Sequence, residues 1–335
     1  MNAVAAGHRR VPVGHEAGDR RPAWPWRRTS LALLAAAAVA LPFTLPPYRL
    51  FQLTLVLVYT VALLGLDLVV GRSGRLSLGH GAFFGVGAYT SAVLIAQFGV
   101  PYPLTLPVAA LATFGLGWAA GRPALRLRGL YLAMVTFAVA VVLPPLLKRL
   151  AGLTGGAMGL TVPTPEGLLG LADDQWVYFL VLLVTAAAFA GMRGLAGSRP
   201  GRALTALREH PAAAETLGIR AATHMTDAFA WSAMYAGVAG TLYTWTAGFV
   251  SPDSFTLALS ITLLAGVVIG GLGTLAGPVL GAFAVLAVPA VAQEFDPAAP
   301  GIVSGLLILL IVYAAPAGLA GLLRRTLWAL LRRRA

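Results

Sequence analysis

The chain has 335 residues, of which 58% are hydrophobic and 11% are charged, and its formal net charge is +12. Soluble domains carry about 25% charged residues. So few charges leave too little polar surface to cover a water-soluble globule, which argues against a soluble enzyme and a soluble nucleic-acid-binding protein. The composition indicates that the lipid bilayer is the solvent of this protein.

The chain lacks the residues that disulfides, cysteine-based sites and ATP-binding P-loops require. The chain has no cysteine, which excludes disulfides, thiolate nucleophiles and cysteine-ligated metals. Its only lysine, Lys148, lies between Leu147 and Arg149, so the Gly-Lys-Ser/Thr step of a phosphate-binding P-loop is absent. If ATP drives this protein, another subunit hydrolyses it. We expect no cofactor and no metal.

Ten apolar runs predict membrane-spanning helices, since a span needs roughly 20 mostly apolar residues. The runs are Ser30–Pro46, Leu50–Val70, Leu78–Phe98, Tyr102–Ala120, Gly129–Leu147, Trp176–Met192, Asp227–Ala247, Leu257–Gly270, Gly277–Val291 and Gly301–Leu323. The eighth and ninth are short and rich in glycine. We therefore predict an all-α polytopic membrane protein with about ten transmembrane helices, within a range of 8–10.

The arginines predict the orientation. If the N-terminus is cytoplasmic, all of the 24 arginines and lysines except Arg49, Lys148 and Arg149 fall in cytoplasmic segments. This is the pattern of the positive-inside rule. It predicts two cytoplasmic termini, in arginine-rich tails at 1–29 and 324–335, around one transmembrane domain at 30–323. Because the positive charges follow topology, we expect lipid and no nucleic acid as their partner.

The first apolar run allows two interpretations. Arg27-Arg28-Thr29-Ser30-Leu31 followed by Ala38-Val39-Ala40 has the form of a twin-arginine signal with a cleavage site, and cleavage would leave nine spans with an external N-terminus. The apolar run, however, continues beyond Ala40 to Pro46. A retained first helix fits this continuation better.

Glycines are concentrated at the start of the third run, where six of them fall between Gly71 and Gly87. An interior glycine costs a helix about 1 kcal/mol relative to alanine. The density predicts a turn that opens into a broken or tightly packed helix, with Gly81 and Gly85 as close-packing positions. His80 lies in this segment, either as a hydrogen-bonding group that lines a path or as a helix–helix contact without a ligand role. Asp67 is expected to pair with Arg72 or Arg75.

Two matches to enzyme motifs are discounted. Gly74 to Gly79 reads G-x-x-S-x-G, one residue longer than a nucleophile elbow. Gly271 to Ala276 fits G-x-G-x-x-A, but it joins two predicted spans and not a strand and a helix. An ion-coupled transporter would need carboxylates within the membrane, yet only Asp67 and Asp227 approach it, both near the cytoplasmic edge. A membrane enzyme would need a deep His/Asp/Glu cluster, which the spans lack.

The longest cytoplasmic loop, at 193–225, has internal order. Leu204 and Leu207 precede Pro211 at helical spacing, and Ala214 and Leu217 follow it. The pattern predicts a short helix, a proline corner, a second short helix and a terminal glycine, all lying flat on the membrane face. The alternative is an ordinary solvated amphipathic loop.

Three longer motifs resemble those of one family, the LivM-type permease subunits of branched-chain amino-acid ABC importers. The first contains Gly71, Gly74, Leu76-Ser77-Leu78-Gly79-His80, Ala82-Phe83-Phe84-Gly85 and Gly87-Ala88-Tyr89; the second contains Gly201–Leu204, Ala212-Ala213 and Leu217–Ile219; the third contains Gly248–Phe255 and Val268–Gly281. Thr154-Gly155-Gly156 resembles a shorter family motif. Together they cover most of 64–281. Arg72, Arg75 and Met158 depart from the family's usual residues, which leaves related permeases for urea or short amides as the alternative.

The resemblance implies a bacterial inner-membrane transport subunit that is not itself an enzyme. Its implied partners are a second permease subunit, two cytoplasmic ATPase subunits and an extracytoplasmic binding protein. We assign the substrate pathway to Ser77, Gly79, His80, Gly81, Phe83, Phe84, Thr154, Gly155 and Gly156. We assign the coupling to the ATPase to Arg202, Leu204, Leu207, Arg208, Glu209, Glu215, Leu217 and Gly218.

Overall fold

The computed structural model describes residues 36–124, 130–168 and 170–295, together with 303, 305–306, 310, 318–323 and 326. The chain divides into two units, Met1–Thr44 and Leu45–Ala335, which we describe separately. In the first unit residues 36–40 are helical, and Leu41–Phe43 form a 3-10 turn. Residues 30–35 of the predicted first span and most of the predicted tenth span lie outside the described residues.

The second unit is helical, with one two-residue strand pair. Its helices are α2 (Pro47–Asp67), α3 (His80–Phe98), α4 (Tyr102–Ala124), α5 (Leu130–Arg149), α6 (Ala151–Thr154), α7 (Asp173–Gly197), α8 (Arg199–Glu209), α9 (Pro211–Thr216), α10 (Ala221–Ala247), α11 (Leu257–Gly270) and α12 (Gly277–Phe295). A π-helical turn, Leu68–Arg72, extends α2, and 3-10 turns occupy Gly156–Met158 and Pro252–Phe255. Strands β1 (Leu160–Thr161) and β2 (Phe249–Val250) pair antiparallel.

Among the described residues, five helices are long and apolar enough to cross a membrane, namely those at Pro47–Arg72, His80–Phe98, Tyr102–Arg122, Tyr131–Arg149 and Asp173–Gly197. The apolar stretches Leu257–Gly270 of α11 and Gly277–Val291 of α12 are shorter. Helix α10 is 27 residues long and contains more polar residues, namely several threonines together with His224, Asp227 and Ser232. The described part of the chain is thus mainly helical and has several candidate spans, as predicted for a polytopic membrane protein. The number of spans stays a prediction.

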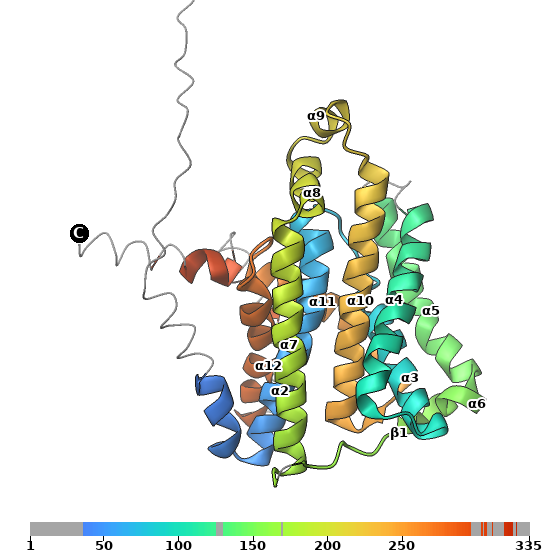
Figure 1. The fold of residues 1–335 in the computed structure, drawn as a ribbon, viewed down its shortest axis with the longest axis vertical. Helices are drawn as coiled ribbons and strands as arrows, with labels where there is room; N and C mark the ends of the chain where they lie inside the picture. The colour runs from blue at the N-terminus through green and yellow to red at the C-terminus, as the bar shows by residue number, and fades with distance from the viewer. Residues whose placement is uncertain are drawn as a thin grey trace, which may run out of the picture. The chain divides into compact units, whose positions relative to one another are not determined.

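The core of the second unit is built around α10, which packs against α2, α3 and α4 (Figure 1). Helices α11 and α12 pair with each other and pack on α2, and α7 covers another side of α2. The bundle has two ends. We call the end that carries α8 and α9 the α8 end, and the end that carries α6 and β1 the sheet end (Figure 1).

The segment between α7 and α10 has the predicted form of two short helices with a proline corner and a terminal glycine. Ser198 caps α8, since its hydroxyl accepts a hydrogen bond from the Gly201 N–H. Helix α8 stops at Glu209 because His210 precedes Pro211 and takes a non-helical conformation (φ −141°, ψ 79°). Gly218 ends the segment with φ +84°, a left-handed value that favours glycine.

Candidate functional site

The first motif closes on a hydrogen-bonded chain of four groups. The Ser77 hydroxyl lies 3.0 Å from His80 Nδ1, and His80 Nε2 lies 2.5 Å from Ser232 Oγ. The Ser232 hydroxyl donates to the carbonyl of Gly65. Its oxygen therefore accepts from Nε2–H, and Nδ1 accepts from the Ser77 hydroxyl. The chain joins the segment before α3 to α10 and α2.

His80 is therefore fully satisfied inside the protein. It is 1% exposed, and both ring nitrogens have partners. The rings of Phe83 and Phe229 meet it edge-on, with centroids 6.2 Å away in each case. A buried histidine in such a network fixes the relative positions of the helices that supply its partners. In this structure His80 makes the helix–helix contact, and its role in a substrate path stays a prediction.

The backbone of the same motif makes close contacts with two other helices. The Leu78 N–H donates to Thr136 Oγ1 of α5, and the Gly81 N–H donates to Ser260 Oγ of α11, each at 3.0 Å. A Cβ atom on Gly81 would lie 2.6 Å from that same Ser260 oxygen. The expected close-packing role of Gly81 is confirmed. The helix is not broken within α3, since the interruption is the non-helical stretch 73–79 that follows the π-helical turn.

The Thr154-Gly155-Gly156 motif forms a tight turn at the sheet end. Gly155 and Gly156 both have left-handed backbones, at φ +72° and +62°. The Thr154 hydroxyl donates to the carbonyl of Leu147 at 2.6 Å, which holds the turn to the end of α5. Thr154 is 4% exposed. The motif directs the chain from α5 into β1.

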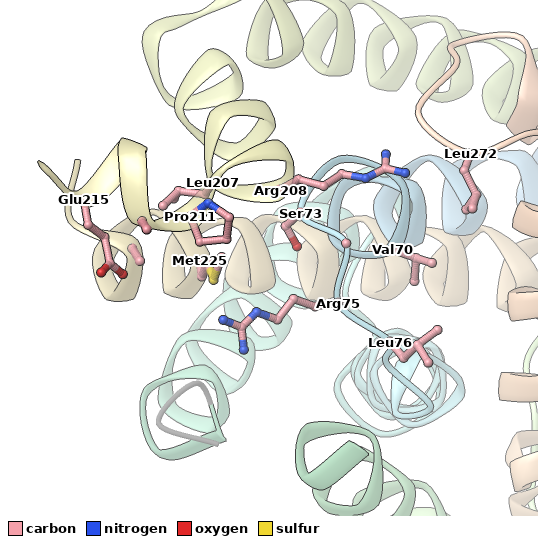
Figure 2. Close-up of a pocket in the computed structure, with 13 residues that line it drawn as sticks. Val70, Ser73, Arg75, Leu76, Leu207, Arg208, Pro211, Glu215, Met225 and Leu272 are labelled. Atoms are coloured by element: carbon pink, nitrogen blue, oxygen red, sulfur yellow. The ribbon is translucent and has the colours of Figure 1, made fainter. Parts of the chain in front are cut away.

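A groove of about 710 Å³ opens at the α8 end (Figure 2). It lies between α8–α9, the start of α10 and the segment that follows α2. Arg208, Arg75 and Glu215 are among its lining residues, and Figure 2 shows Arg208 extending toward Leu272 and Arg75 extending in the opposite direction. Apolar side chains complete the wall, and among them Leu76 is 48% exposed. The groove thus offers exposed apolar surface beside two guanidinium groups and one carboxylate.

The predicted coupling residues separate into two faces. Leu204 and Leu207 are each 2% exposed and belong to the protein's own core. This corrects the expectation that they dock on a partner, because their side chains already pack inside the chain. Leu217, by contrast, is 82% exposed. The remaining exposed members are Arg202, Arg208, Glu209, Glu215 and Gly218.

Asp67 hydrogen-bonds to a partner that the sequence did not predict. Its carboxylate accepts a hydrogen bond of 2.7 Å from the N–H of Gly273, in the turn between α11 and α12. Arg72 and Arg208 lie close enough to act on it electrostatically. Asp67 is 4% exposed, so these contacts offset part of the cost of burying its charge. Hydrogen bonding across 206 residues gave no local signal in the sequence.

The structure also shows where the two matches to enzyme motifs lie. The G-x-G-x-x-A match lies in the turn between α11 and α12, with a helix on each side and no strand before it. Ser77 is fully buried, so the serine–histidine contact at 3.0 Å is closed to solvent. Within the described part of the chain, no group of three or more His, Cys, Asp or Glu residues is placed to hold a metal ion.

These helices define a polytopic membrane protein, and comparison with known proteins gives its family. The family model for the permease component of branched-chain amino acid transport systems matches residues 48–314. The chain belongs to this family.

Two kinds of relative match the chain. The high-affinity branched-chain amino acid transport system permease protein LivM of Escherichia coli (strain K12) is 35% identical over 319 residues, covering 88% of this chain and 75% of that protein. LivM of Salmonella typhimurium is 34% identical over 320 residues, with the same coverage. LivH of Salmonella typhimurium is 25% identical over 287 residues, covering 78% of this chain and 91% of that protein. No solved structure matches the chain significantly.

Proposed function

We propose that this chain is the membrane-spanning permease subunit of an ATP-binding-cassette importer for leucine, isoleucine and valine. The observation that carries the proposal is the 35% identity to LivM over 88% of the chain. Similarity to both LivM and LivH supports a transporter with two related permeases, of which this chain supplies one. Two ATPase subunits and an extracytoplasmic binding protein complete the assembly.

The distribution of positive charge supports an inner-membrane location with the α8 end in the cytoplasm. Within the described residues, the arginines at the α8 end are Arg72, Arg75, Arg122, Arg193, Arg199, Arg202, Arg208 and Arg220. Those at the sheet end are Arg49 and Arg149, joined by Lys148. The excess at the α8 end is the pattern of the positive-inside rule. The groove and α8–α9 then face the ATPase.

The residues of the first motif are buried inside the bundle, beside the proposed substrate path. Ser77, His80, Phe83 and Phe84 are all at most 5% exposed, so we propose that they hold α3 in place beside the path. The three departures from family residues lie toward the ends of the bundle, with Arg72 at the end of the π-helical turn after α2. Arg75 lines the groove at the α8 end, and Met158 is 88% exposed at the sheet end. None of the three lies in the middle of the bundle, which favours branched-chain amino acids over urea or short amides.

The test is uptake by proteoliposomes that contain this chain with its partner permease, ATPases and binding protein. We expect ATP-dependent uptake of leucine, isoleucine or valine, and no ATP hydrolysis by this chain purified alone because it has no P-loop lysine. Uptake of urea or acetamide without uptake of these amino acids would replace the proposal with its alternative.

A further inference from the structure

Three segments that are distant in sequence meet at the last turn of α2. The Arg208 guanidinium of α8 donates to the carbonyl of Gly71, and the Gly273 N–H of the α11–α12 turn donates to Asp67. Asp67 ends α2, and Gly71 lies in the π-helical turn that follows it. The segment Asp67–Gly71 therefore contacts both α8 and the α11–α12 turn.

The backbone at Gly71 is packed so closely that no side chain fits there. A Cβ atom on Gly71 would lie 2.0 Å from Asp67 Oδ1 and 2.5 Å from the Gly273 nitrogen. Only a glycine allows the three segments to approach this closely. The last carbonyls of a helix have no partner within it, so the carbonyl of Gly71 is free to accept from an outside donor. A cation at this position also interacts favourably with the helix dipole.

The Arg208 side chain is exposed along part of its length, but its guanidinium reaches the carbonyl of Gly71. Figure 2 shows it leaving α8 and running toward the end of α2, close to Val70 and Leu272. Leu207, its neighbour in α8, is buried in the same core. Helix α8 is therefore attached to the membrane helices by a packed leucine and by a charged hydrogen bond to a backbone carbonyl.

We propose that Arg208 is a positioning residue that transmits movement of α8 to the π-helical turn of α2 and, through Asp67, to the α11–α12 turn. The proposal rests on the proposed function, in which the ATPase moves α8. π-Helical turns are rare and often mark a functional position. Because α2 packs against α7, α10, α11 and α12, a displacement at Gly71 reaches most of the bundle. Arg208 is thus assigned to transmission and not to docking of the ATPase.

Arg208→Met separates these two roles in the assembled transporter. We expect the ATPase subunits to co-purify as with the unaltered chain and to hydrolyse ATP, while substrate uptake per ATP falls at least tenfold. Arg208→Lys, which keeps a cationic donor, restores part of this ratio. The matched control is Arg199→Met in the exposed first turn of α8, for which uptake per ATP stays within twofold. An unaltered ratio in Arg208→Met, or loss of the ATPase from the complex, overturns the proposal.

A second measurement keeps Arg208 in place and decides the question even if the variant does not reach the membrane. The chain has no cysteine, so pairs of spin labels are introduced at Thr205 with Leu272, and at Thr205 with Gly152 of α6 at the sheet end. On ATP binding we expect the first distance to stay constant and the second to change. A change within the first pair, or none in either, contradicts the proposal. If the unaltered complex transports no branched-chain amino acid, the proposed function fails and not this inference.

Discussion

Single glycines set the distance between two central helices. A Cβ atom on Gly87 of α3 would lie 2.1 Å from the carbonyl oxygen of Gly237 in α10, and one on Gly240 would lie 2.0 Å from the carbonyl of Phe84. At this separation the Thr244 hydroxyl donates to the carbonyl of Ala88 at 3.0 Å. Small residues in membrane helices allow such backbone approach, and the added hydroxyl bonds strengthen it.

Gly87→Ala therefore forces α3 and α10 apart. Overpacking of this kind costs about 1–3 kcal/mol, so we expect a lower melting temperature in detergent, measured by size-exclusion chromatography after heating. The matched control is Gly115→Ala in α4, where no atom lies within 4 Å of the added methyl group. There alanine removes the cost of an interior glycine, and stability is equal or higher. An equal loss in both variants would show that contact with α10 is not the cause.

At the scale of elements, α8 and α9 expose one face and bury the other. Leu207 packs inside the chain, whereas Leu217 extends from the turn after α9 and is 82% exposed. A large apolar side chain at the rim of a membrane protein fits an interface with a cytoplasmic partner. Removing Leu207 therefore tests the fold of the permease, and only Leu217 tests docking of the ATPase.

Leu217→Asp should release the ATPase from the complex. Burying a leucine at an interface contributes roughly 1.5–3 kcal/mol, which corresponds to at least a tenfold loss of affinity. The measurement is recovery of the ATPase subunits with tagged permease in detergent. Leu168→Asp, 57% exposed on the far side of the bundle before α7, is the control that keeps full recovery. Equal recovery in the two variants would exclude Leu217 from the docking surface.

At the scale of the whole molecule, the more polar residues of α10 lie inside the protein. Ser232, Thr241 and Thr244 are all fully buried, and each bonds to the backbone of α2 or α3. By contrast, α5 exposes Tyr131, Met134 and many other apolar side chains. Polar groups inside and apolar groups outside are the arrangement that a bilayer requires.

This arrangement predicts opposite membrane sides for the two ends of the bundle. Cysteines replacing Asp173 at the start of α7 and Thr205 in α8 are both exposed, in a chain that has no cysteine of its own. We expect a membrane-impermeant maleimide added outside intact cells to label the Asp173→Cys variant alone. Thr205→Cys should react only after the cells are opened. Labelling of both from the same side would refute the orientation.

Features that depend on local composition were predictable from the sequence. The apolar run Leu257–Gly270 became α11 with the same bounds, and the α8–Pro211–α9–Gly218 form followed from spacing, a proline and a glycine. Side-chain periodicity and backbone preference act within a few residues, so a single sequence contains them. The family resemblance, carried by the same short motifs, was confirmed by the comparisons.

Which partner each polar or apolar side chain meets was decided only by the tertiary structure. The sequence suggested that Leu207 faces outward and that Asp67 pairs with a neighbouring arginine, and the fold placed the first in the core and the second on Gly273. His80 likewise hydrogen-bonds to Ser232, which is 152 residues away in the sequence. An apolar side chain can pack equally well in the core or against the surface of a partner. A buried polar group can bond to any donor or acceptor within reach. Only the packing of whole helices determines which one that is.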